Sequence, residues 1–377
     1  MKQNKSHHHL ALKVGILGGG QLARMLALSG FARGLEVHAL SENPTDPVAQ
    51  VSHFWVQGSP DNQADLVSFS KHLDLLTFES EFFNAAGIEK SLGRHKKKLF
   101  PSTKCMSMIQ DRAKQKVLLD DFGIPTAPFI VVHEPEDLVS SLKVFGPMVL
   151  KKRQGGYDGN GTWVLRNPNQ IAKIDKKLFL APGFIAEKFI PFSRELAVMF
   201  VRSRSGQKQA LPLTQSVQKS SRCDYVLGPV THSGFLALQK KFFKMLDAID
   251  YVGVLGVELF DTGTQLLVNE LAPRVHNSGH YSQNALNSSQ FDLHWMAGLD
   301  LELPEVQIQE KAFAMINLIG RKNTSRMKAP NALSGHLHWY GKGESRPGRK
   351  MGHVNYSGPE IKKLLAQGLR ERNLFRI

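Results

Sequence analysis

The first hundred residues alternate short apolar runs with helical patterns. An apolar run at residues 14–17 is followed by three glycines, and residues 21–29 then carry apolar side chains at helical spacing. Further apolar runs occupy residues 35–40 and 73–78. Because strands that alternate with helices form parallel sheets with crossover connections, we expect a Rossmann-like parallel-sheet domain over residues 10–100.

The following segment combines a long helical pattern with a glycine-rich strand pair. The pattern predicts one helix over residues 102–122, which Gly123 ends. Short apolar runs at 149–152 and 161–165 flank a glycine-rich loop. We therefore expect a linker helix and a small lid domain over residues 101–190.

The remainder of the chain, residues 191–377, predicts a larger third domain. Apolar positions between 235 and 249 follow helical spacing, and the runs at 254–260 and 265–270 indicate a hairpin. The fold class that we expect is α/β, and α+β overall: a parallel-sheet domain, a lid and a larger C-terminal domain.

Composition places the chain among globular proteins. It has 377 residues, of which 42% are hydrophobic, so it can bury two or three cores. Cys105 and Cys223 are far apart and form no metal motif, which favours free thiols in a reducing compartment. No apolar run is long enough to cross a membrane, and the polar start lacks a signal core. We expect a cytoplasmic protein.

The formal net charge of +15 fits a nucleic-acid surface, phosphate-rich substrates or a basic proteome. The basic residues are spread along the chain, with one short cluster at 95–98. Because no basic stripe alternates with aromatic residues, we expect neither a nucleic-acid nor a membrane partner.

A glycine-rich turn, Gly18 to Gly20, joins the first predicted strand to its helix. Backbone N–H groups at a helix N-terminus suit phosphate, and Glu42 follows at the spacing of a ribose-binding acidic residue. The match to the dinucleotide fingerprint is loose. A tight turn that allows strand and helix to pack is the interpretation that we favour.

Residues 151–161 place two lysines and an arginine before four closely spaced glycines. Such a loop can fold its backbone over an anion and can move, which suits a nucleoside triphosphate. A plain hairpin loop is the alternative.

Glu258 and Glu270 lie twelve residues apart on the predicted hairpin. Strand pairing centred near Thr264 would put them opposite each other on one face. A bound Mg²⁺ would relieve the repulsion between two facing carboxylates, and Asn269 adds a polar group. A solvent-facing pair is the alternative.

Two late clusters are rich in arginine, lysine and histidine. Residues 273–280 contain Arg274, which could bind a phosphate or carboxyphosphate in a bidentate manner. Residues 340–353 contain Lys342 and Arg349, which could hold a substrate phosphate or form a basic surface loop. The sequence has no Walker lysine motif, so bound ATP would not lie in a P-loop.

Taken together, these motifs resemble the carboxyaminoimidazole ribonucleotide synthase family of ATP-grasp ligases. The similarity runs from the glycine turn at 18–20 to the tail motif at 346–353, and it is most specific at 155–161, 268–280 and 340–353. It implies three domains, a dimer, and ATP bound between the lid and the third domain.

The resemblance also implies a reaction and a set of site residues. Bicarbonate would attack the γ-phosphate of ATP to give carboxyphosphate, which then carboxylates the amine of aminoimidazole ribonucleotide. The residues implied for ATP are Arg112, Lys151, Gly156, Tyr157, Asp158, Gly159, Asn160, Gly161, Thr162, Glu187, Lys188, Phe189, Ile190, Glu195, Gln218, Asn269 and Glu270. Those implied for Mg²⁺ are Glu258 and Glu270, those for the ribonucleotide Gln21, Arg274, Lys342 and Arg349, and those for catalysis Lys151, Arg274, Tyr157 and Asp158.

Four positions depart from the family pattern. Gln218 lies where the family commonly has a nucleotide-binding histidine, and glutamine cannot become cationic. Asn160 and Thr162 replace a basic residue and a glutamine in the lid loop, and Ser80 replaces an aromatic. These changes could weaken ATP binding, but Lys151 is retained.

Two other functions stay open at this point. One is a different ATP-grasp enzyme, such as a ribonucleotide transformylase or another carboxylase. The other is a nucleotide-binding or nucleic-acid-binding relative without turnover, which the Gln218 departure and the net charge would favour.

Overall fold

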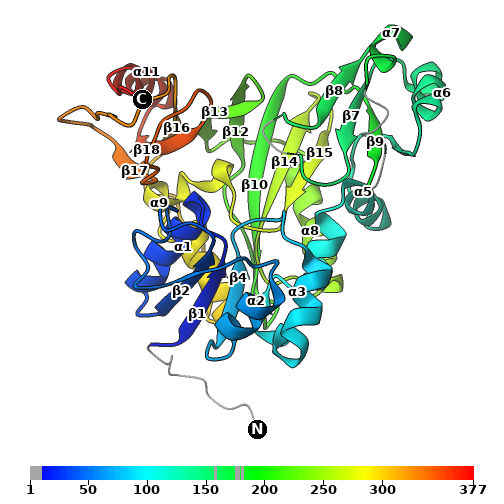
Figure 1. Cartoon of the computed structure of the whole chain (residues 1–377). Helices are drawn as coiled ribbons and strands as arrows, with labels where there is room; N and C mark the ends of the chain where they lie inside the picture. The colour runs from blue at the N-terminus through cyan, green and yellow to red at the C-terminus, as the bar shows by residue number, and fades with distance from the viewer. Residues whose placement is uncertain (1–10, 157–158, 175–178, 180–181) are drawn as a thin grey trace.

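The structure is a computed structural model, and it describes residues 11–156, 159–174, 179 and 182–377. Three sheets organise these residues, with five, four and nine strands (Figure 1). No helix in the described part of the chain has the length and hydropathy that a membrane-spanning segment requires.

The first sheet is parallel throughout and has the order β3-β2-β1-β4-β5, which confirms the predicted parallel sheet with crossover helices. Its central strand, β1, carries four consecutive buried residues. The strands are β1 (Lys13–Leu17), β2 (Glu36–Ser41), β3 (Phe54–Gln57), β4 (Leu75–Phe78) and β5 (Leu99–Phe100). The connecting helices are α1 (Gln21–Ala32), α2 (Gln63–Ser70), α3 (Ala85–Leu92) and the 3₁₀-helix η1 (Gly93–Lys98).

The single helix predicted over residues 102–122 is wrong, because two helices, α4 (Thr103–Ile109) and α5 (Arg112–Asp121), occupy this segment. Asp111 separates them: its carboxylate accepts hydrogen bonds from the backbone N–H groups of Ala113 and Lys114. This is N-cap geometry, so α5 starts afresh and its first residue, Arg112, points toward the lid. The predicted stop at Gly123 is confirmed by its positive φ of 58°.

The lid is a four-stranded antiparallel sheet with the order β6-β9-β7-β8, seen at the upper right of Figure 1. Helices α6 and α7 pack against its strands around a small apolar core. The strands are β6 (Phe129–Val132), β7 (Met148–Lys152), β8 (Thr162–Leu165) and β9 (Phe184–Lys188). The helices are α6 (Pro135–Phe145) and α7 (Pro168–Ile171).

The third sheet has the order β15-β14-β10-β12-β13-β16-β18-β17, with β11 paired to β10. The predicted hairpin is confirmed as β14 and β15. The strands are β10 (Arg194–Arg202), β11 (Lys208–Ala210), β12 (Thr214–Lys219), β13 (Arg222–Gly228), β14 (Gly253–Asp261), β15 (Leu266–Ala272), β16 (Ala312–Ile319), β17 (His336–Trp339) and β18 (Lys350–Gly358). The helical elements are α8 (Phe235–Ala248), η3 (Asn277–Gly279), α9 (Ser282–Ala285), α10 (Gln290–Leu299) and α11 (Ile361–Arg372).

Helix α10 fixes the first sheet against the third. Its Trp295 donates an indole hydrogen bond to the backbone oxygen of Leu26 at 2.8 Å, and its Asp292 accepts one from Ser29 at 2.7 Å. The buried His294 accepts from the backbone N–H of Val254 at 3.1 Å, which leaves its Nε2–H to donate to Thr77 at 2.7 Å. Burial lowers the pKa of His294 to about 3, so this bridge is neutral.

Close packing at this interface predicts a large effect for one added methyl group. A Cβ on Gly298 of α10 would lie 2.2 Å from the Phe100 ring, which is itself buried. We expect Gly298→Ala to lower the free energy of unfolding by about 2 kcal/mol, measured by urea unfolding, despite the better helix propensity of alanine. Gly343→Ala is the control, because nothing lies within 4 Å of its added Cβ. Equal unfolding midpoints for the two variants would contradict the packing argument.

Candidate functional site

A cavity of about 700 Å³ lies where the first sheet, the lid and the third sheet meet. Most of the predicted site residues line it. They are Gln21, Arg112, Lys151, Gly156, Gly159, Thr162, Glu187, Lys188, Phe189, Ile190, Glu195, Gln218, Glu258, Asn269, Glu270 and Arg274. Asn160, Gly161, Lys342 and Arg349 are not among the described residues that line it, and Tyr157 and Asp158 lie outside the described residues.

The β14–β15 hairpin brings two carboxylates together at one wall of this cavity. Glu258 pairs directly with Glu270, but the register shifts next to this pair, where Leu259 faces Val268. The shift is a β-bulge that takes up Asn269 as the extra residue. The facing carboxylates that the sequence predicted are therefore present, and a bulge produces them rather than the regular pairing that we assumed.

Arg112 joins the start of α5 to the lid and to the hairpin. Its guanidinium donates to the backbone oxygens of Lys152 at 3.0 Å and Gly156 at 3.2 Å. It also forms an ion pair with Glu270 at 2.7 Å. One arginine thus fixes the entry to the glycine loop relative to the carboxylate pair.

Glu187 is shared between two lysines. Its carboxylate lies 2.9 Å from the Nζ of Lys151 and 3.1 Å from the Nζ of Lys116, and Lys151 also donates to Asn269 at 2.9 Å. Burial alone would raise the pKa of Glu187, but the two lysines hold it below its ordinary value. The sequence prediction placed Glu187 with the nucleotide and missed Lys116. A signal was present, because Lys116 follows Arg112 by four residues on the same face of one helix.

The glycine-rich loop has the backbone that its composition predicted. Gly155, Gly159 and Gly161 have φ values of 76°, 83° and 78°, which other residues rarely adopt. A Cβ on Gly156 would lie 2.9 Å from the backbone oxygen of Asn160. The loop can therefore stay close to the cavity only with these glycines.

An apolar wall follows the last lid strand. Lys188, Phe189 and Ile190 line the cavity. Two further aromatic rings that the sequence analysis missed, Phe192 and Phe260, stack with centroids 4.5 Å apart. Flat apolar side chains beside a strand edge suit a planar base.

Glu195 and Gln218 complete this side of the cavity. Burial raises the pKa of Glu195, and a hydrogen bond from Gln218 acts in the opposite direction. Gln218 also donates to Ser216 at 3.0 Å, at a register shift in the β12–β13 pair. The glutamine therefore keeps a polar contact at this position, although it brings no charge.

The opposite end of the cavity belongs to the first and third sheets. Arg274 binds the carboxylate of Glu81 through two nitrogens, one of them at 2.7 Å. The sequence analysis assigned no role to Glu81, which lies just after the carboxyl end of strand β4 in the first sheet. Residues at such strand ends meet at one edge of a parallel sheet, and this rule could have found it.

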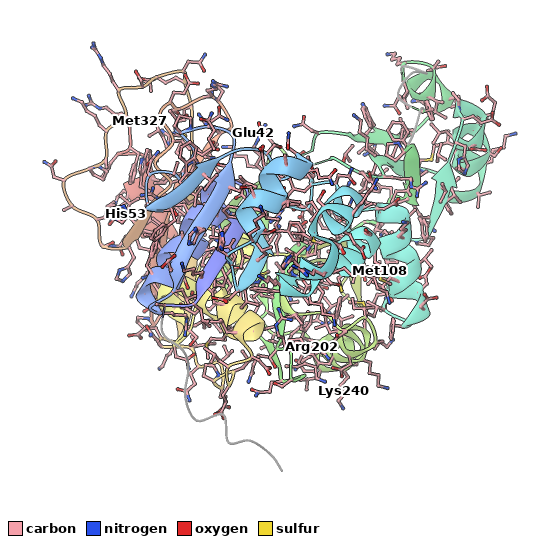
Figure 2. All side chains as sticks on the ribbon, turned by 60° about the horizontal axis from the view of Figure 1, so that its bottom comes forward. Glu42, His53, Met108, Arg202, Lys240 and Met327 are labelled. Atoms are coloured by element: carbon pink, nitrogen blue, oxygen red, sulfur yellow. The ribbon has the colours of Figure 1, made fainter. Side chains whose placement is uncertain are left out.

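The carboxylate of Glu79 occupies the place at the Gly18–Gly20 turn where the sequence analysis considered a bound phosphate. This carboxylate accepts hydrogen bonds from the backbone N–H groups of Gly20 at 2.6 Å and Ala23 at 3.1 Å. Two N–H groups at the N-terminus of α1 therefore already have a carboxylate partner. Glu42 is exposed and lies directly after β2 (Figure 2), and it is not among the described residues that line the cavity. Both observations favour the tight-turn alternative over the dinucleotide interpretation.

The tail motif reaches the cavity through a lysine that the sequence analysis did not name. Lys350 lines the cavity, whereas Lys342 donates to the backbone oxygen of Lys350 at 2.7 Å. Arg349 donates to the backbone oxygen of Glu344 at 2.9 Å. The spacing of this motif could not reveal which basic side chain turns inward.

Three family models match the chain and together cover most of it. They are a ribonucleotide synthetase preATP-grasp domain at residues 11–110, an ATP-grasp domain at 117–291 and a phosphoribosylaminoimidazole carboxylase C-terminal domain at 314–367. The expected ATP-grasp fold is thereby confirmed.

Curated relatives and solved structures agree with these models. The chain is 37% identical to the N5-carboxyaminoimidazole ribonucleotide synthase of Synechococcus elongatus, over 90% of this chain and 88% of that protein. It is 36% identical to that of Haemophilus influenzae, over 93% and 90%.

Among solved structures, the N5-carboxyaminoimidazole ribonucleotide synthetase of Thermus thermophilus superposes with a TM-score of 0.86 at 36% identity, covering 96% of this chain and 98% of that one. The Aspergillus clavatus N5-carboxyaminoimidazole synthase, in complex with ADP and 5-aminoimidazole ribonucleotide, superposes with a TM-score of 0.84 at 29% identity, covering 97% and 98%. Sequence, fold and cavity thus lead to one conclusion: the chain belongs to the N5-carboxyaminoimidazole ribonucleotide synthase family of ATP-grasp ligases.

Proposed function

We propose that this protein carboxylates 5-aminoimidazole ribonucleotide to N5-carboxyaminoimidazole ribonucleotide, with ATP and bicarbonate, in purine biosynthesis. The observation that carries the proposal is one shared cavity, which is lined both by charged residues of the lid and hairpin and by the Arg274–Glu81 pair, where the ribonucleotide would lie. One cavity of this size holds a nucleotide and a second small substrate together.

The nucleotide would lie between the lid and the β14–β15 hairpin. Lys151 and Arg112 lie where they would meet its phosphates, and the glycine loop would close over them. Phe192 and Phe260 offer the flat surface for its base, and Glu195 would reach its ribose. Tyr157 and Asp158 of the loop remain candidates for catalysis by resemblance.

The hairpin carboxylates fit a divalent cation. Burial and the nearby carboxylates of Glu270 and Glu195 raise the pKa of Glu258 to about 7, so an ionised Glu258 lacks sufficient positive charge around it. Among the described residues no cluster of three or more His, Cys, Asp or Glu side chains could hold a metal alone. Two carboxylates plus phosphate oxygens and water are the ligand set that Mg²⁺ commonly takes, so Glu258 and Glu270 would hold it.

The side chains around the cavity divide the reaction between them. Lys151 and Arg112 would neutralise charge on the phosphates as bicarbonate attacks, and bound Mg²⁺ would supply further charge neutralisation. Arg274 would orient the anionic carboxyphosphate, for which it must share its guanidinium with Glu81. Loop closure would exclude water from this labile intermediate.

Two further properties expected from the family are proposals as well. We propose a homodimer, which sedimentation equilibrium would test directly. We propose a cytoplasmic location, which agrees with the two cysteines being free thiols in the structure.

The activity predicts a ribonucleotide-dependent release of ADP. With ATP, Mg²⁺ and bicarbonate, we expect release only when aminoimidazole ribonucleotide is present, and we expect Glu270→Ala to reduce it by at least about 100-fold because a metal ligand is lost. Glu302→Ala, at an exposed position, is the control and should match the unaltered chain. Folded protein without ribonucleotide-dependent release would overturn the proposed function.

The raised pKa of Glu258 predicts that removing its charge stabilises the fold but weakens metal binding. A carboxyl with a folded-state pKa near 7 and an ordinary unfolded pKa destabilises the fold above pH 7, and this penalty fades as the pH falls from 7 toward 4.5. Without metal or nucleotide, Glu258→Gln should therefore be more stable than the unaltered chain by about 2 kcal/mol at pH 8, and by much less at pH 5.

Thermal unfolding at both pH values measures this difference, with Glu310→Gln at an exposed position as the control. For half-maximal ADP release, the Glu258→Gln protein should need an Mg²⁺ concentration at least about tenfold higher than the unaltered chain needs. A variant that is less stable at pH 8, or that keeps the original Mg²⁺ requirement, would contradict the assigned charge balance.

A further inference from the structure

His280 lines the cavity but has no role in the reaction outlined above. It follows η3 in the third domain, and its side chain is buried. Its Nδ1 atom lies 2.9 Å from the side-chain nitrogen of Gln290, while its Nε2 atom has no hydrogen-bond partner among the described residues. Nε2 is also not among the fully buried unpartnered atoms of the described residues, so this polar atom of a cavity-lining ring is accessible to a ligand.

The proton position on His280 follows from Gln290. The side-chain oxygen of Gln290 accepts from the backbone N–H of His276 at 2.9 Å, and its amide nitrogen donates to the backbone oxygen of the same residue at 2.8 Å. This orientation makes the amide nitrogen the donor to His280 as well. The Nδ1 atom of His280 must therefore accept, and its proton resides on Nε2.

A stack of two more imidazoles supports the ring. His353 lies with its centroid 4.8 Å from that of His280, and His338 lies 4.6 Å from His353 on the far side. His353 interacts with Tyr340 at 2.9 Å and Gln283 at 3.0 Å, so both of its nitrogens are used. The neighbouring rings thus hold His280 in one orientation.

The same surroundings keep His280 neutral. Burial lowers its pKa well below the ordinary histidine value, and the nearby histidines and the cations Lys350 and Arg274 act in the same direction. The ring therefore offers one uncharged N–H donor, in a cavity that those two cations also line. An uncharged donor suits an uncharged acceptor.

We propose that His280 is a substrate-specificity residue, whose Nε2–H group donates a hydrogen bond to the free ring nitrogen of the aminoimidazole base. This inference rests on the proposed function. The base has one ring nitrogen that is not bonded to ribose, and this atom carries a lone pair. A hydrogen bond there leaves the lone pair of the exocyclic amine free to attack the carboxyl donor.

Two substitutions distinguish the loss of the Nε2–H donor from the loss of the hydrogen bond between His280 and Gln290. In His280→Asn, the side-chain oxygen can still accept from Gln290, but no group reaches the position of Nε2. In His280→Gln, the amide nitrogen reaches about that position and retains a donor. We expect the KM for aminoimidazole ribonucleotide to rise about 10- to 100-fold in His280→Asn and less than about fivefold in His280→Gln, because losing a partner leaves a buried polar atom unsatisfied.

Two further measurements distinguish recognition of the base from a general structural effect. The KM for ATP should stay within about twofold in both variants, since the contacts of the ring are with Gln290, Phe291 and His353 and not with residues assigned to the nucleotide. His294→Asn is the control: this equally buried histidine is bonded on both sides and is not among the described cavity-lining residues, so stability should fall while the ribonucleotide KM stays the same.

Equal ribonucleotide KM values for His280→Asn and the unaltered chain would overturn the role of His280. A parallel rise in both KM values, or no difference between the Asn and Gln variants, would also overturn it. If the unaltered chain releases no ADP in response to the ribonucleotide, the proposed function fails first and this inference fails with it.

Discussion

The contact on which the site depends most is the carboxylate of Glu187 between Lys116 and Lys151. It joins the linker helix α5 to two lid strands, and Lys151 continues the chain of contacts to Asn269 on the third sheet. Glu187 and Lys116 are nearly inaccessible to solvent, so neither charge could be tolerated alone. This arrangement leaves one lysine more than the carboxylate needs, at the wall where a triphosphate would lie.

Charge balance organises the other side of the cavity in the same way. Glu270 has Arg112 as its partner, and Arg274 has Glu81. Among the described residues, Glu258 has only His276 within ion-pair distance, at 3.7 Å, and burial and two neighbouring carboxylates raise its pKa. The proposed Mg²⁺ would supply positive charge at this position.

The rigid and movable parts of the fold have separate tasks. The interface of α1 and α10 fixes the first sheet to the third, so the end of the cavity lined by Arg274 and Glu81 keeps its shape. The glycine loop of the lid, with its positive φ values, can change conformation at low cost. A ligase that must protect a water-sensitive intermediate needs both properties.

The sequence by itself determined the α/β class, the parallel first sheet and the hairpin, because local periodicity specifies these features directly. Most of the cavity lining followed from the resemblance of the sequence motifs to the family. The Asp111 cap that split a predicted helix is also local, because the carboxylate bonds to N–H groups two and three residues further on, and the periodicity reading overlooked it. Tertiary structure decided the rest. Glu79 of a distant segment bonded to the glycine turn, and Lys350 rather than Lys342 lined the cavity. Both depend on how segments far apart in the chain meet, and spacing along the chain carries no information about that.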